Sequence, residues 1–148
     1  MTNDKFATDH LLSSTQQKCL SALLDTIMPA AEDGSMPSAG KMDFLGFILA
    51  QAENFMPALV QILDQLDEKF ANDPLAARVA RLEDFARADK KAFNRLLVRV
   101  YDCYYQDDQV RVLIGIKPGP PFPQGNTVEP GDLSLLDAVV ERGQGYRR

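Results

Sequence analysis

Residues 91–104 read KAFNRLLVRVYDCY, and this stretch carries the clearest periodic pattern in the chain. Its apolar side chains recur three and four positions apart, which is the spacing of one face of an α-helix. They are Phe93, Leu96, Leu97, Val100, Tyr101 and Tyr104. Lys91, Arg95 and Arg99 fall on nearly the opposite side. The stretch therefore predicts an amphipathic helix that packs its apolar face, both tyrosines included, into a core, while Tyr105 points elsewhere.

Helical patterns also precede this stretch, and proline and glycine separate them. Ser14 and Gln17 have the capping-box spacing that opens a helix, and Pro29 ends that helix. Residues 29–40 hold two prolines, two glycines and an Asp-Gly turn signal, so they form a loop. Further helices are expected over residues 42–55, 57–70 and 75–85.

The residues after Tyr105 predict two more short helices around an extended run. Asp107 and Asp108 favour a helix start, and Gly115 closes that helix. Five of the nine prolines follow between residues 118 and 130, where proline lacks the backbone donor that a helix needs. Ser134 and Asp137 then open a last helix.

The expected fold is therefore all-α. It is an irregular bundle of about six or seven helices with a Pro/Gly-rich C-terminal segment. Residues 1–12 are expected to be a flexible N-terminus, and residues 13–148 a single helical domain. Within that domain, residues 118–131 form a connection and residues 132–143 the C-terminal helix.

Composition narrows the classes of function. Apolar residues make up 45% of the chain, the net charge is −5, and no apolar stretch is long enough to span a bilayer. A nucleic-acid partner is disfavoured, because phosphate binding needs a concentrated basic footprint. Residues 1–10 show neither an export signal nor a twin-arginine pair. We therefore expect a cytoplasmic protein, or a periplasmic one if the chain is trimmed or exported with a partner.

No residue pattern indicates catalysis, a metal or a bound cofactor. The single histidine, His10, rules out a His-centred triad. The two cysteines have no CxxC spacing and are expected to be buried or half-buried free thiols. An enzyme that acts through carboxylates such as Asp25 and Asp43 is the remaining catalytic alternative. The Lys91, Arg95 and Arg99 stripe is either a solvated face or a contact for an acidic partner. The proline run is either a structural connection or a protein epitope.

Three stretches of the sequence together resemble the motifs of a known protein family. The first is LS at 12–13, QQ at 16–17, Leu20 and ALLDTIMPA at 22–30. The second is PSAG at 37–40 followed by FL at 44–45. The third is YYQDDQV at 104–110, then Leu113, Ile114 and Gly115, and then a Pro-Gly segment. Together they resemble the gluconate 2-dehydrogenase subunit 3 family over residues 12–125, with an unmatched middle.

The resemblance implies an accessory subunit that is helical, non-catalytic and free of cofactor. Such a subunit binds a flavin-dependent dehydrogenase of the glucose-methanol-choline type, which holds the FAD, and aids its maturation or export. A cytochrome c subunit is the further partner in such complexes. The chain lacks the twin-arginine signal that many members of the family carry.

The partner is expected to contact the loop at residues 29–40 and the segment at residues 105–125. The candidate contact residues are Pro29, Pro37, Tyr105, Pro118, Pro120, Pro121, Phe122 and Pro123. The alternative is a free-standing soluble helical protein with no redox partner, either a monomer or a self-associating homodimer.

Overall fold

The computed structural model describes residues 11–119, 125 and 131–143. These residues form seven α-helices and three short 3₁₀-helices and contain no strand, so the expected all-α class is confirmed. The contacts of the chain divide it into two units, residues 1–118 and residues 119–148. The division falls at Pro118, the first proline of the run, and the single domain expected over residues 13–148 stays a prediction.

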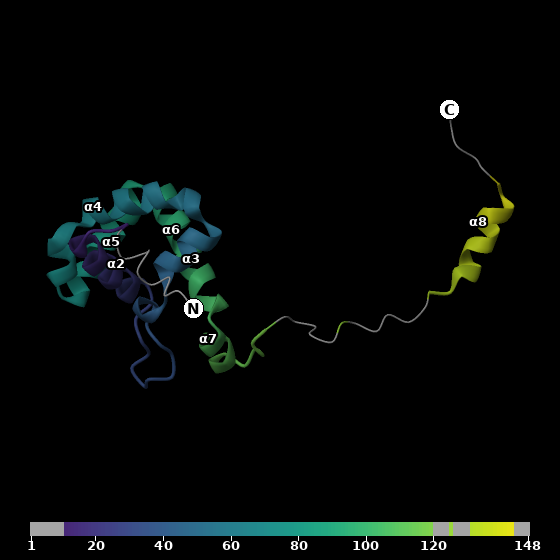
Figure 1. The fold of residues 1–148 in the computed structure, drawn as a ribbon, viewed down its shortest axis with the longest axis horizontal. Coiled ribbons are helices and arrows are strands. Elements are labelled where there is room, and N and C mark those ends of the chain that lie inside the picture. Colours follow the sequence, from purple (N-terminus) through teal and green to yellow (C-terminus); the bar gives the residue numbers. More distant parts are fainter. Residues whose placement is uncertain (1–10, 120–124, 126–130, 144–148) are drawn as a thin grey trace, which may run out of the picture. The chain divides into compact units, whose positions relative to one another are not determined.

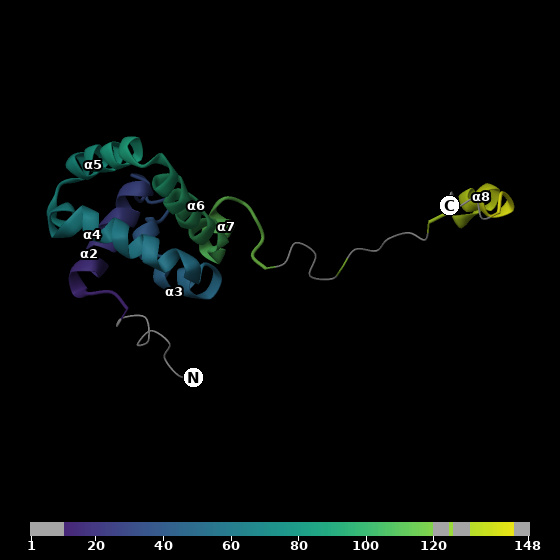
Figure 2. The same ribbon diagram turned by 90° about the horizontal axis from the view of Figure 1, so that it is seen from above.

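The core of the first unit lies between α2 (Ser14–Ile27) and α4 (Met56–Asn72), which share the largest helix contact of the chain. The two helices lie side by side in both views (Figures 1 and 2). α4 buries the face predicted from its spacing. Its buried side chains are Leu59, Ile62, Leu63, Leu66 and Phe70. α5 (Leu75–Ala88) contacts α2 and α6, but of its side chains only Leu82 is fully buried.

Residues 91–104 lie within α6 (Lys90–Gln106), which contacts α3, α5 and α7. Leu96, Val100 and Tyr104 are buried as predicted. Three predicted core positions differ, because Phe93 and Leu97 are only half-buried and Tyr101 is exposed. Cys103 turns inward instead, since it lies one helical turn after Val100 on the side that α3 and α7 cover.

The helix expected over residues 42–55 is interrupted. It consists of α3 (Phe44–Gln51), a break at Ala52 and the 3₁₀-helix η2 (Glu53–Phe55), after which α4 begins. Ala52 has φ −147° and ψ 40°, which no α-helix accepts. The break turns Phe55 into the core, where its side chain is 1% exposed. Burial of this large ring is the gain that offsets the lost helical turn.

Two predicted helix starts are wrong by one or two residues, whereas α5 begins at Leu75 as expected. α2 is capped by Ser13 and Gln16 rather than by Ser14 and Gln17, although both pairs have the capping-box spacing. α5 follows Pro74 without a side-chain cap. In the second unit, Asp132 caps the 3₁₀-helix η3 (Leu133–Leu136), and α8 (Asp137–Glu141) follows directly. The backbone, not the spacing of the sequence, selects among adjacent polar residues that can each serve as a cap.

Candidate protein-docking surface

The loop predicted to contact a partner is tied down at both of its ends. One backbone hydrogen bond joins its two ends: the Ala39 amide donates to the Met28 carbonyl at 2.9 Å. A second lies inside the loop, where the Ala31 amide donates to the Met36 carbonyl at 3.0 Å. The short 3₁₀-helix η1 (Ala39–Lys41) follows and packs on α2. Two backbone hydrogen bonds of this kind restrict the loop to a narrow range of conformations.

A tyrosine of α6 holds the middle of this loop. The Tyr104 hydroxyl donates a hydrogen bond of 2.7 Å to the Pro37 carbonyl, across 67 positions of sequence. Tyr104 is only 2% exposed. Burial raises the pKa of its phenol, and the neighbouring Tyr105 and Asp107 raise it further. The hydroxyl therefore stays protonated and remains a donor at neutral pH. The bond brings together two segments, the loop and the end of α6, that the sequence nominated separately.

Ser38, the residue after Pro37, and Asp25 of α2 also anchor the loop. The Ser38 hydroxyl donates to a carboxylate oxygen of Asp25 at 2.7 Å and accepts from the Gly40 amide at 3.0 Å. Arg78 of α5 lies 3.7 Å from the same carboxylate and donates to the Ala22 carbonyl at 3.1 Å. The Asp25 carboxylate thus joins α2, the loop and α5. Sequence reasoning had considered Asp25 only as a possible catalytic group.

The other carboxylate considered for catalysis also has a local structural contact. Asp43 is the N-cap of α3, and its side chain accepts a hydrogen bond of 3.0 Å from the Gly46 amide. N-capping satisfies one of the backbone donors that the first turn of a helix leaves open.

Exposed aromatic rings lie beside the anchored loop. The Tyr105 ring packs edge-on against the Tyr104 ring at a centroid distance of 5.2 Å, and it is 47% exposed as the sequence indicated. Tyr101 lies 6.5 Å from Tyr105. Tyr101 is not in the core because it borders an open hollow of about 290 Å³ between α2, α5 and α6, which no described residue fills. The sequence missed this exposure, because periodicity shows which residues share a face but not what covers that face.

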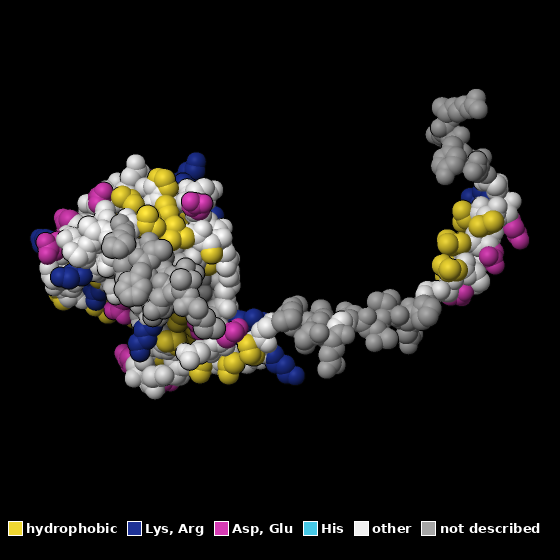
Figure 3. Space-filling model, viewed as in Figure 1, with side chains coloured by type: hydrophobic (Ala, Val, Ile, Leu, Met, Phe, Trp, Pro, Cys, Tyr) yellow, Lys and Arg dark blue, Asp and Glu magenta, His cyan; other side chains and the backbone are white. Residues whose placement is uncertain are grey.

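Further exposed apolar side chains lie on α7 (Asp108–Leu113) and the residues after it. Val110 anchors this helix in the core, and four large apolar side chains beyond it are exposed. With the two tyrosines they make up what we call the tyrosine surface: Tyr101, Tyr105, Val112, Leu113, Ile114 and Ile116. Yellow side chains gather over α7 and the segment after it in Figure 3. Exposed apolar groups that cluster in this way are typical of interaction sites.

The candidate contact residues of the sequence fall into two groups. Pro29 and Pro118 are exposed and Pro37 is half-buried over Tyr104. The start of the proline run is held against α7, because the Arg111 guanidinium donates to the Lys117 carbonyl at 3.0 Å. The other members, Pro120, Pro121, Phe122 and Pro123, lie outside the described residues.

Replacing Tyr104 with Phe is expected to free the loop without unfolding the protein. The change removes one hydrogen bond but keeps the buried ring, so the free energy of unfolding should fall by only about 1 kcal/mol. Limited proteolysis should cleave residues 29–37 faster in Tyr104→Phe than in the parent protein. Tyr105→Phe is the matched control, because its ring is exposed, and it should leave both measurements unchanged. Equal cleavage rates in all three proteins would contradict the anchoring role of Tyr104.

Both cysteines are buried free thiols, as expected. Burial is the main reason that the pKa of each rises from 9.0 to about 11, and nearby carboxylates, Asp67 for Cys19 and Asp43 for Cys103, add to the shift. Between these two values the unfolded chain loses thiol protons that the folded chain keeps. The stabilisation is therefore complete below about pH 9 and is lost as the pH rises through about 11.

The free energy of unfolding should accordingly decline between these two pH values in urea titrations. The double variant Cys19→Ala/Cys103→Ala should show a flatter decline over the same range, because Ala does not titrate. An identical slope in both proteins would show that other groups cause the alkaline loss. Both native thiols should also resist iodoacetamide at pH 8, since only a thiolate reacts.

In residues 11–119, 125 and 131–143, no three or more His, Cys, Asp or Glu side chains are grouped so that they could hold a metal ion. Among the same residues, no helix has the length and apolar character needed to cross a membrane. No family model matches the chain, and neither does any curated protein or solved structure.

Proposed function

We propose that this chain is a non-catalytic accessory subunit that binds a flavin-dependent dehydrogenase of the glucose-methanol-choline type and aids its maturation or export. The dehydrogenase supplies the FAD, and a cytochrome c subunit of the complex carries the electrons onward. The resemblance of residues 12–125 to the gluconate 2-dehydrogenase subunit 3 family supplies the identity of the partner. The geometry of the tyrosine surface and its loop supports the mode of action, which is binding.

The observation that carries the proposal is the hydrogen bond from Tyr104 to the Pro37 carbonyl. It fixes the loop at residues 29–40 beside the exposed ring of Tyr105. A surface that is ordered before binding loses less conformational entropy when a partner docks. Exposed tyrosines are also among the residues that contribute most to binding free energy at protein interfaces. The loop and the tyrosine surface together therefore offer a pre-organised docking site.

The proposal is tested by purifying the tagged chain from its source cell under mild conditions. We expect a second protein to co-purify and to show the absorbance spectrum of bound flavin. Tyr105→Glu should reduce the flavin recovered by at least tenfold, because it places a charge in an apolar contact. It should not lower the thermal midpoint, since Tyr105 is 47% exposed.

Leu75→Glu is the matched control. Leu75 is 45% exposed and lies on α5, away from the tyrosine surface, so its replacement should leave flavin recovery unchanged. Recovery of the monomer alone, with no flavin absorbance, would overturn the proposal.

A homodimer is the competing use of the same surface, because six exposed apolar side chains also suit a two-fold symmetric contact. Sedimentation velocity of the purified chain distinguishes the two. An accessory subunit separated from its partner should sediment as a monomer at micromolar concentration. A stable dimer that Tyr105→Glu dissociates would favour self-association and count against a dehydrogenase at this surface.

A further inference from the structure

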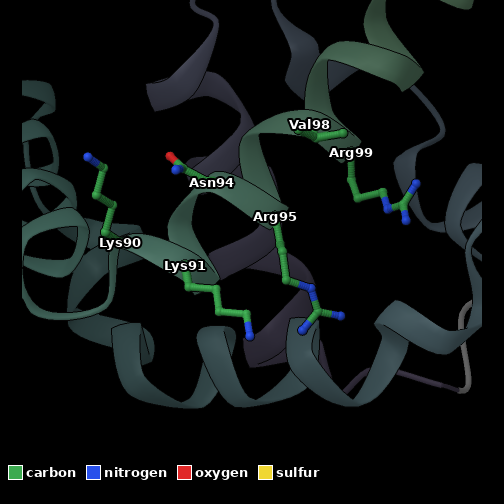
Figure 4. A pocket seen from close by; sticks show the side chains of 6 residues that line it. All are labelled: Lys90, Lys91, Asn94, Arg95, Val98 and Arg99. Carbon is green, nitrogen blue, oxygen red and sulfur yellow. The ribbon is translucent and has the colours of Figure 1, made fainter.

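A second surface on α6 has a different chemistry from the tyrosine surface. Six side chains of one helix face border a hollow of about 550 Å³: Lys90, Lys91, Asn94, Arg95, Val98 and Arg99. Figure 4 shows Lys91 and Arg95 extending from the same side of the helix. We call these residues the cationic strip. We propose that the cationic strip binds an acidic amphipathic helix of a partner protein.

The charge of the strip is unusual in this chain. Residues 90–99 contain four Lys or Arg and no Asp or Glu, whereas the whole chain has a net charge of −5. Of these four cations, only Arg99 forms an ion pair with a described residue, at 3.8 Å from Asp102. The Arg95 guanidinium lies over the Phe55 ring, 5.7 Å from its centroid. Lys90, Lys91 and Arg95 therefore present positive charge that no described carboxylate neutralises.

The position of Lys90 and Lys91 in α6 also supports a binding role for the cationic strip. Asp89 is the N-cap of α6, so Lys90 and Lys91 occupy its first two helical positions. The helix dipole is positive at that end and disfavours cations there, and the first turn contains no acidic residue. Local stability thus argues against lysine at both sites. A sequence that breaks a local rule without a compensating contact is expected to do so where function requires it.

A seat with both polar and apolar side chains adjoins the strip. A second hollow of about 270 Å³ lies between α4 and α6 and shares Lys91 and Arg95 with the first. Its apolar lining is Phe55, Ala58, Ile62, Phe85 and Ala92, and its other polar lining is Gln61, Gln65 and Asp89. A partner that places an apolar side chain in this seat would set neighbouring carboxylates on the lysine and arginine beside it. The strip itself runs about 13 Å along α6, which is between two and three helical turns.

This geometry selects a helix over the other anionic ligands. α6 alone supplies all the side chains of the larger hollow, so the hollow is open on its other side. Small ligands need a site that covers most of their surface. A nucleic acid would gain from the cations but not from the apolar side chains of the seat. An amphipathic helix with carboxylates three or four residues apart meets both the charge and the seat.

The test uses two synthetic helical peptides with Leu along one face and either Glu or Gln along the other. Fluorescence anisotropy with the full chain should show the Glu peptide binding at least tenfold tighter than the Gln peptide, with affinity falling as salt rises. Lys90→Glu/Lys91→Glu should weaken the Glu peptide at least tenfold. Acidic residues suit the first turn of α6, so this variant should melt no lower than the parent protein.

Lys18→Glu is the matched control, because Lys18 is exposed on α2, outside the strip, and its reversal changes net charge in the same direction. It should leave the affinity for the Glu peptide within twofold. The proposal is overturned if the Glu peptide does not bind, if the Gln peptide binds equally well, or if the Lys90→Glu/Lys91→Glu variant keeps full affinity. Tighter binding of a single-stranded oligonucleotide than of the Glu peptide would also overturn it. None of these results depends on whether the partner is a dehydrogenase.

Discussion

Phe55→Ala is expected to lower the free energy of unfolding by about 3–5 kcal/mol, the range for truncating a fully buried aromatic side chain. The Phe55 ring is 1% exposed and lies under the Arg95 guanidinium. Removing the ring leaves a cavity at η2. The break at Ala52 separates α3 from α4, so the two helices cannot close this cavity as one continuous helix. Urea denaturation followed by circular dichroism measures the change.

Phe47→Ala provides the comparison, because Phe47 lies on α3 and is only half-buried. It should cost clearly less than Phe55→Ala. A loss below about 1 kcal/mol at Phe55 would mean that the site collapses around the missing ring, or that the break does not direct Phe55 into the core. The comparison therefore tests the feature of the fold that sequence periodicity missed.

Leu96→Ala is expected to cost about 2–5 kcal/mol, because its side chain is completely buried on the inner face of α6. Leu97→Ala should cost less. Leu97 is half-buried and borders the open hollow beside Tyr101, so its surroundings already contact solvent. Val98→Ala, at a side chain that is 53% exposed, should stay within about 0.5 kcal/mol of the parent protein.

The order of these three neighbouring substitutions is the informative result. They lie on one helix and delete apolar atoms of similar kind, so helix propensity contributes little to their differences. A larger loss at Leu97 than at Leu96 would show that the faces of α6 are assigned wrongly. A helix turned in this way would also move the Tyr104 hydroxyl away from the Pro37 carbonyl.

Much of the fold could be predicted from the sequence because its signals are local. The four-residue spacing of Leu96, Val100 and Tyr104 gives the buried face of α6, and all three are buried. Pro29 and Gly115 end helices where their backbone restrictions require it. The break at Ala52 was not predictable, because alanine favours helix and only the burial of Phe55 explains the turn.

The candidate site was predictable only in its parts. The sequence predicted Pro37 and Tyr105 as contact residues and Tyr104 as a core residue. It could not show that the Tyr104 hydroxyl meets the Pro37 carbonyl, because hydrogen bonds between residues 67 positions apart leave no periodic trace. Nor could it show that Tyr101 is exposed, since that depends on the space between α2, α5 and α6.

The amino-acid sequence by itself determined that this protein is helical and where most of its helices run. Backbone propensity and the 3.6-residue repeat act over a few residues, and a sequence displays them directly. The tertiary structure alone decided which apolar side chains are covered and which remain exposed. That outcome depends on the packing of helices distant in sequence, and it is the reason that Tyr104 anchors the loop while Tyr101 and Tyr105 stay available at the surface.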